Sequence, residues 1–146
     1  MVSATNPPTK VFIDSSVLIA AAISVKGSAR DLILRSMKGD FDLYISAFVL
    51  EEVERNLSRK APAALPAFEV LRTVFPNIVD PDKSLVVRVA EVVEAKDAPI
   101  VAAAISVEAE YLATYDQKHL LKQRSLIQST YQVNVVTPDE VLQKRP

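Results

Sequence analysis

The sequence KVFIDSSVLIAAAIS, residues 10–24, passes from a strand pattern into a helix pattern at one acidic residue, Asp14. Residues 10–14 are an apolar run rich in β-forming side chains and closed by an acid, which predicts a short buried strand. Residues 15–24 predict a short helix that Ser15 or Ser16 can cap. A buried strand that leads directly into a helix is typical of a parallel sheet covered by helices.

The same alternation continues along the rest of the chain. Further strands are predicted over residues 41–46, 77–81, 110–116 and 133–137. Helices are predicted over residues 28–38, 47–60, 61–75, 82–95, 98–109 and 138–146, with a short helix or turns within 117–129. This order predicts an α/β fold with a central, mainly parallel sheet of short strands covered on both faces. Residues 1–146 are the size of one domain, and residues 1–9 are expected to be a flexible lead-in.

The composition excludes several classes of site. The chain has no cysteine, which excludes disulfides and thiolate metal sites and fits a reducing cytosol. His119 is the single histidine, which argues against zinc sites and against a Ser–His–Asp triad. Gly27 and Gly39 are the only glycines, too few for a glycine-rich phosphate loop. The net charge is −1 and no apolar run approaches 18 residues, so neither a global positive field nor a membrane span is expected.

Four acids lie where predicted strands or loops lead into helices: Asp14, Glu52, Asp97 and Asp116. In an α/β fold these positions can converge on the crevice outside the carboxyl ends of the strands. A crevice lined with carboxylate oxygens suits a hard divalent cation such as Mg²⁺ or Mn²⁺. The four acids, as we call them below, therefore point to metal-assisted phosphodiester chemistry.

Each acid also has an ordinary structural interpretation. Asp14 and Asp97 can cap the helices that follow them, and Asp116 can be a turn residue. Helical geometry does not choose among Glu51, Glu52 and Glu54, because the core face of that helix is centred on Leu50, Val53 and Leu57 and Glu54 lies nearest to it.

Four short motifs occur in a recognisable order: Asp14-Ser15-Ser16-Val17-Leu18-Ile19, Leu50-Glu51-Glu52-Val53, Asp97-Ala98-Pro99-Ile100 and Thr114-Tyr115-Asp116. Together they resemble the PIN-domain nuclease family, which includes VapC-type toxins of toxin–antitoxin pairs. The resemblance covers roughly residues 10–142 and favours Glu52 as the second acid, with Glu51 as the alternative. Ser16 and Thr114 are candidates for hydroxyls that orient Asp14 and Asp116.

The resemblance implies a three-layer α/β/α domain in which the four acids bind one or two Mg²⁺ or Mn²⁺ ions and cleave RNA. It also implies a homodimer, and an antitoxin protein as a further partner if the chain is a toxin. The small toxins often carry another acid shortly after the fourth one, but Lys118, His119 and Leu120 occupy that stretch here. The alternative is a PIN-fold module that binds RNA or protein without catalysis.

Two other phosphoryl-transfer folds also end their first strand with an acid. A receiver domain needs an acidic pair there and a lysine after its last strand, and neither is evident. A haloacid-dehalogenase-like phosphatase needs an aspartate two residues after Asp14, where Ser16 stands.

Overall fold

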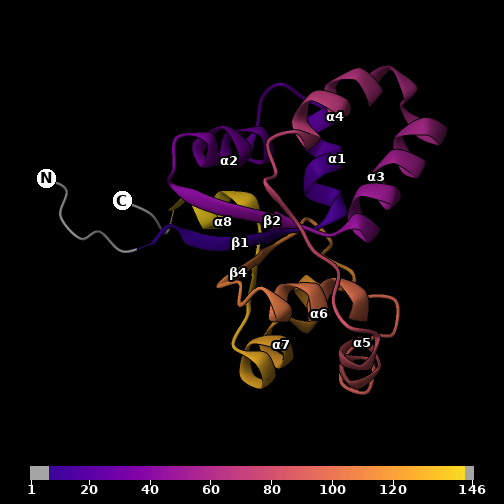
Figure 1. The fold of residues 1–146 in the computed structure, drawn as a ribbon, viewed down its shortest axis with the longest axis vertical. Helices are drawn as coiled ribbons and strands as arrows, with labels where there is room; N and C mark the ends of the chain where they lie inside the picture. The colour runs from indigo at the N-terminus through magenta and orange to yellow at the C-terminus, as the bar shows by residue number, and fades with distance from the viewer. Residues whose placement is uncertain (1–6, 144–146) are drawn as a thin grey trace, which may run out of the picture.

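The computed structural model describes residues 7–143, in which five strands form one sheet (Figure 1). Every strand pair is parallel, and the order across the sheet is β3-β2-β1-β4-β5. The strands are β1 (Thr9–Ile13), β2 (Phe41–Ile45), β3 (Asn77–Ile78), β4 (Tyr111–Ala113) and β5 (Asn134–Val136). The predicted parallel sheet of short strands is confirmed.

Helices cover both faces of this sheet. On one side α1 and α2 pack together, α8 packs on α2, and α3 and α4 pack on α1; on the other side α5 packs on α6 and α7 packs beside β5 (Figure 1). The helices are α1 (Ser15–Ile23), α2 (Ser28–Met37), α3 (Ala47–Lys60), α4 (Leu65–Arg72), α5 (Lys83–Val89), α6 (Ala98–Ser106), α7 (Arg124–Tyr131) and α8 (Pro138–Gln143), with 3₁₀ turns η1 (Pro62–Ala64) and η2 (Leu121–Gln123). The expected α/β/α layering is therefore present.

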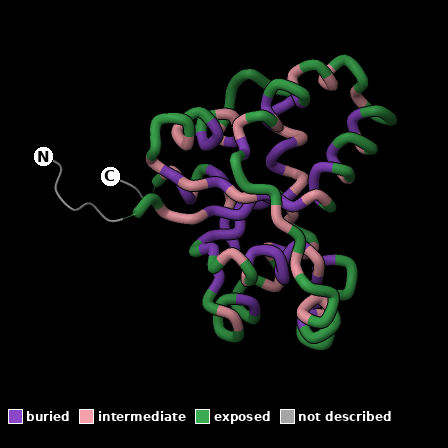
Figure 2. The backbone as a smooth tube through the Cα atoms, in the orientation of Figure 1, coloured by how far each residue is buried: buried purple, intermediate pink, exposed green. Residues whose placement is uncertain are grey.

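The central strand β1 explains why the sheet is buried on both faces. Val11, Phe12 and Ile13 are all fully inaccessible to solvent, and Val11 lies opposite Leu43 of β2 and Tyr111 of β4. Their burial follows from the unbroken apolar run in the sequence, which is typical of a strand covered by helices on both sides. Buried segments run through the middle of the molecule, whereas exposed ones lie at its periphery (Figure 2).

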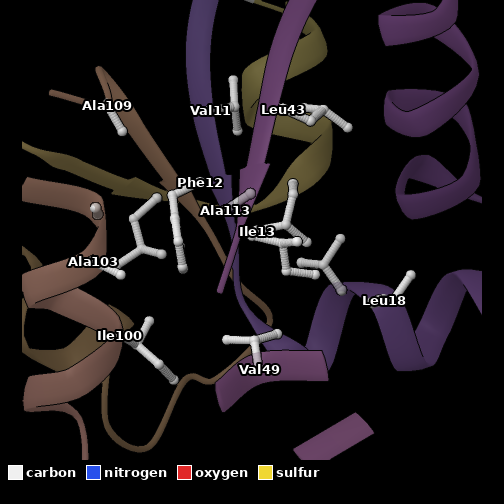
Figure 3. Close-up of a cluster of buried hydrophobic side chains, with 14 of the residues drawn as sticks. Val11, Phe12, Ile13, Leu18, Leu43, Val49, Ile100, Ala103, Ala109 and Ala113 are labelled. Atoms are coloured by element: carbon white, nitrogen blue, oxygen red, sulfur yellow. The ribbon is translucent and has the colours of Figure 1, made fainter. Parts of the chain in front are cut away.

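Helix α6 lies close to the sheet because its inner face is made of small residues. Ala103 faces β1 and β4, together with Ile100 from the preceding turn (Figure 3). Alanine side chains let the helix backbone approach the strands closely, and the packing buries almost the whole helix, including Ala102 and Ala104. This approach brings Asp97, just before α6, to the carboxyl ends of the strands.

The chain order across the sheet creates a switch point beside β1. After β1 the chain builds β2 and β3 on one side, and it then crosses to the other side to build β4 and β5. The two halves diverge between β1 and β4, where ligands bind in open α/β sheets.

Several predicted boundaries were wrong. The first strand runs from Thr9 to Ile13, so the lead-in ends before Thr9 and Asp14 lies outside the strand; of residues 1–9, residues 1–6 lie outside the described part of the chain. The predicted strand over 110–116 is limited to Tyr111–Ala113, and the one over 77–81 to Asn77–Ile78. Both strands end where their neighbours end, because Ile78 pairs with Ile45, the last residue of β2, and Ala113 pairs with Ile13 and Val136, the last residues of β1 and β5.

Helix ends differ from the predictions for identifiable reasons. The helix expected over 82–95 stops at Val89, consistent with the weak helix propensity of its many valines. The helix expected over 98–109 stops at Ser106, and Glu108 then adopts a left-handed conformation with φ 58°. Residues 61–75 divide into η1 and α4, and the last helix is described only to Gln143. Gly39 follows the C-cap of α2 with φ 91°, a left-handed conformation that glycine adopts readily.

Candidate active site

The four acids line one pocket of about 390 Å³ at the carboxyl ends of β1 and β4. Its lining residues are Asp14, Ser15, Ser16, Ile19, Glu52, Lys96, Asp97, Ile100, Tyr115, Asp116 and Leu120. A pocket of similar volume, about 410 Å³, lies beside α2 and β2, and Asp42 is the only acid among its described lining residues. The acidic pocket, as we call the first one, therefore combines the switch point of the sheet with a cluster of oxygen ligands.

Asp14 is fixed from both sides of the switch point. It follows β1 directly, and its backbone N–H donates to the carbonyl of Ala113 on β4 at 3.0 Å. Its side chain is 3% exposed, and Oδ2 accepts hydrogen bonds from Thr114 Oγ1 at 2.6 Å and from Ser16 Oγ at 2.9 Å. Asp14 occupies the N-cap position of α1, but no cap hydrogen bond to its carboxylate is present in the described chain. Helix capping therefore does not account for this carboxylate.

Thr114 connects the first acid to the fourth. Its buried hydroxyl donates to Asp14 and accepts the backbone N–H of Asp116 at 2.9 Å. Ser16 makes a parallel link, because its Oγ accepts the N–H of Tyr115 at 2.9 Å. The two hydroxyls orient Asp14 as the sequence suggested, whereas Thr114 contacts the backbone of Asp116 and not its carboxylate.

Asp116 lies three residues beyond the end of β4, in the loop that leads to η2. It is half-buried, and its Oδ1 accepts the N–H of His119 at 3.2 Å, which is the turn interaction expected of an aspartate after a strand. The turn and pocket roles are compatible, since a carboxylate has further acceptor positions.

Glu52 reaches the pocket from the second turn of α3, whose first turn is capped by Ser46. Its Oε1 is buried and has no hydrogen-bond partner within residues 7–143. Glu51 and Glu54 are exposed and lie outside the pocket lining, so the expectation that Glu54 lies nearest the core was wrong. An unpartnered buried carboxylate oxygen in a pocket with three other acids is the donor arrangement that a cation would satisfy.

Asp97 is the second deeply buried acid, with 5% of its surface exposed. Burial is the largest cause of a raised pKa for its carboxyl group, and the negative charge of nearby Asp116 raises this pKa further. The hydrogen bond from Gln123 and the charges of Lys96 and His119 act in the opposite direction. Like Asp14, Asp97 stands at an N-cap position without a side-chain cap hydrogen bond in the described part of the molecule. Pro99 lies in the first turn of α6, where its missing N–H costs nothing.

A second group of ligand atoms shares Asp97. Glu94, Asp97 and His119 each place one ligand atom within 4.8 Å of the others, and His119 Nδ1 lies 2.9 Å from Glu94 Oε2. The sequence patterns assigned no ligand role to His119, Glu94 or Gln123, because none of them is a motif acid. The group offers a candidate cation position next to the acidic pocket.

The sequence matches a family model described as PIN domain over residues 10–118. The chain belongs to the PIN domain family. The match spans all four acids and confirms the resemblance seen in the motifs. No curated protein matches this sequence.

Solved structures with a similar fold include other PIN-like chains. The crystal structure of PAE2754 from Pyrobaculum aerophilum has a TM-score of 0.66 and 19% identity, with 93% of this chain and 94% of that chain covered. VapC20 of Mycobacterium tuberculosis, described as a sarcin–ricin loop cleaving toxin, has a TM-score of 0.55 and 18% identity over 74% and 91% of the two chains. VapBC-1 from nontypeable Haemophilus influenzae has a TM-score of 0.60 and 14% identity over 90% and 99%. These similarities establish that the PIN domain has the fold of these structures.

Within residues 7–143, no helix combines the length and the apolar character needed to cross a bilayer.

Proposed function

We propose that this PIN domain is a ribonuclease that depends on Mg²⁺ or Mn²⁺ and hydrolyses phosphodiester bonds within RNA. The observation that carries the proposal is the convergence of the four acids on one pocket from four separate segments of the chain. PIN domains are generally nucleases, and the motifs of this chain resemble those of VapC-type toxins.

The donor set fits a hard divalent cation. All four acids offer carboxylate oxygens, and the buried Oε1 of Glu52 has no hydrogen-bond partner within residues 7–143, so a cation could satisfy it. The Oδ2 atoms of Asp14 and Asp97 accept from hydroxyl and amide donors, and Asp14 Oδ1 accepts a long hydrogen bond, 3.4 Å, from Ser15 Oγ. A carboxylate has about four acceptor positions, so both side chains keep capacity for a ligand. In this proposal the four acids hold one ion, and Glu94 and His119 extend the site toward a second.

The chemistry divides between the ion and the protein. When bound, a divalent ion lowers the pKa of a coordinated water and neutralises charge on the phosphoryl oxygens. Thr114 and Ser16 keep Asp14 oriented, and Gln123 donates to Asp97. Histidine is not needed as a general base, which suits a chain with a single one.

Lys96 supplies positive charge at the pocket. It is the only lysine or arginine among the lining residues described, and its charge lowers the pKa of the neighbouring Asp97. A lysine at this place can contact a phosphate of the RNA backbone. The basic residues of α3, Arg55, Arg59 and Lys60, are exposed and lie outside the pocket lining.

The biological role that best fits the resemblance is the toxin of a toxin–antitoxin pair, acting on RNA in the cytoplasm. One structural neighbour is described as a toxin that cleaves the sarcin–ricin loop, which makes a structured RNA loop a reasonable first substrate to test. An antitoxin protein would then be a partner. A homodimer is the assembly we propose, and the exposed side chains of Val87 and Val92 are apolar surface that it could cover.

Cleavage of defined RNAs tests the proposal. The purified protein is incubated with a structured and an unstructured RNA in Mg²⁺, in Mn²⁺ and in EDTA, beside Asp14→Asn, Asp97→Asn and the exposed control Glu51→Gln. We expect cleavage only with metal, a loss of at least roughly 10²-fold in both aspartate variants, and no loss in Glu51→Gln. Cleavage in EDTA, or full activity of the aspartate variants, would refute the proposal. RNA binding without cleavage would support the inactive binding module instead.

A further inference from the structure

Gln123 connects three segments around the acidic pocket. It is the last residue of η2, directly before α7, and lies 26 residues from Asp97 in the sequence. Its side-chain Nε2 donates to Asp97 Oδ2 at 3.0 Å and to the carbonyl of His119 at 3.0 Å. Its Oε1 accepts the backbone N–H of Glu94 at 3.1 Å. One amide therefore joins the segment before α6, the α6 N-terminus and the turn after Asp116.

The chemistry of these contacts fixes the orientation of the amide. The carboxylate of Asp97 and the carbonyl of His119 can only accept from it, and the N–H of Glu94 can only donate. If the oxygen and nitrogen of the Gln123 amide were exchanged, its oxygen would face the carboxylate of Asp97 and the carbonyl of His119, which are both acceptors. Its NH₂ group would then face the N–H of Glu94, which is a donor. Both N–H groups and the carbonyl of the amide are used.

Asp97 depends on this contact more than Asp14 depends on any single one. Asp14 accepts from both Thr114 and Ser16, whereas Gln123 is the only donor to the Asp97 carboxylate in the described structure. A buried ionised carboxylate needs such a donor, and a single donor also decides which way its other oxygen points.

We propose that Gln123 is a positioning residue for metal binding, which holds Asp97 with one oxygen tied and the other directed to the pocket. The proposal rests on the function proposed above. Gln123 lies beyond residues 10–118 that match the family model, so the match does not include it. Because it also holds the backbone of Glu94 and of His119, it keeps the Glu94–His119 pair next to Asp97.

Hydrogen-bonding partners of metal ligands affect metal affinity by about 10–100-fold when they are removed. Replacing Gln123 by methionine keeps the length and helix propensity of the side chain but removes all three hydrogen bonds. Replacing it by asparagine keeps the amide on a side chain one methylene shorter. The matched control is Gln128→Met, because Gln128 is an exposed glutamine on the following helix.

Two measurements test the proposal: isothermal titration calorimetry with MnCl₂, which gives the dissociation constant, and the melting temperature in EDTA, which gives the stability of the metal-free protein. We expect the dissociation constant for Mn²⁺ to rise about 10–100-fold in Gln123→Met and in Gln123→Asn, and to stay unchanged in Gln128→Met. A purely structural role would lower the melting temperature in EDTA but leave the dissociation constant within about threefold of wild type, and this result would overturn the proposal. If wild type itself binds no Mn²⁺, the proposed function fails, which is a separate outcome.

A measurement on the wild-type protein covers the case in which the variants do not fold. In a titration with Mg²⁺ followed by NMR, the side-chain amide signals of Gln123 should shift, and those of Gln128 should not. Binding of Mg²⁺ with no shift at Gln123 would contradict the proposal, since the amide donates directly to an acid of the pocket.

Discussion

Replacing Thr114 by valine should destabilise the protein strongly although the two side chains have nearly the same shape. Thr114 is fully buried, donates to Asp14 Oδ2 at 2.6 Å and accepts the N–H of Asp116 at 2.9 Å. The substitution removes both contacts and leaves a methyl group against a carboxylate. Valine is a good strand former, so the adjoining strand β4 should persist.

The expected size of the effect follows from the two lost contacts. A hydrogen bond to a charged group contributes about 1.5–3 kcal/mol, and a lost acceptor for a backbone N–H costs roughly 1 kcal/mol more. Ser16 still donates to Asp14, which limits the loss to about 2–4 kcal/mol in the free energy of unfolding. For a chain of this size, that is a fall in melting temperature of roughly 5–15 °C.

Thermal unfolding followed by circular dichroism in EDTA measures this effect. Thr114→Ser keeps the hydroxyl and should lose less stability than Thr114→Val, and Thr130→Val is a control at an exposed position of α7. If Thr114→Val melts at the wild-type temperature, or melts above Thr114→Ser, the hydroxyl does not hold the two acids together in the way described.

Three further substitutions, one metal addition and one assembly measurement give further predictions. Asp97→Asn should raise the melting temperature in EDTA at about pH 7 and have less effect at about pH 4. Burial raises the folded-state pKa of Asp97, so its ionisation destabilises the folded state progressively as the pH rises from the unfolded-state pKa through the raised one, and equal effects at both pH values in scanning fluorimetry would contradict this. Mn²⁺ at a hundredfold excess over its dissociation constant should add about 2.7 kcal/mol to wild type, or roughly 5–10 °C, and clearly less to Asp97→Asn. Lys96→Gln should reduce RNA cleavage. The slope of the logarithm of the cleavage efficiency against the logarithm of the salt concentration should also become shallower, by about the contribution of one phosphate contact, and an unchanged slope would show that Lys96 does not contact a phosphate. Glu52→Gln should weaken Mn²⁺ binding in calorimetry while Glu51→Gln should not, and the opposite ranking would exchange their roles. Light scattering should give about 32 kDa, twice the 16.0 kDa of one chain, and a 16 kDa species at micromolar concentration would count against the dimer.

The sheet and the convergence of the acids could be predicted from local patterns. The apolar run before Asp14 requires a buried strand, and the small residues after Asp97 require a helix that packs closely. Parallel strands joined by helices place their carboxyl ends at one edge, so acids at these junctions meet whatever the lengths of the loops. The same reasoning does not locate boundaries, as the early ends of α5 and β4 show, since these depend on pairing and packing with distant segments.

The supporting contacts could not be predicted from the sequence. Gln123 reaches Asp97 only because the turn after Asp116 folds back toward the α6 N-terminus, and no periodicity encodes that path. Glu94, which is grouped with Asp97 and His119, lies beyond the end of α5, whereas the sequence predicted a helix through this position. Helical geometry alone did not distinguish Glu52 from Glu51, because a helical wheel does not contain the orientation of α3 relative to β1; only the motif favoured Glu52, which lines the pocket.

A crystal of the protein soaked in MnCl₂ and measured for anomalous scattering tests the central claim most directly. The claim is that Asp14, Glu52, Asp97 and Asp116 form the site of a divalent ion. The account predicts an anomalous peak in the acidic pocket about 2 Å from carboxylate oxygens of at least two of these residues, and no such peak in an Asp97→Asn crystal. Peaks confined to other parts of the surface, or an identical peak in Asp97→Asn, would contradict the account.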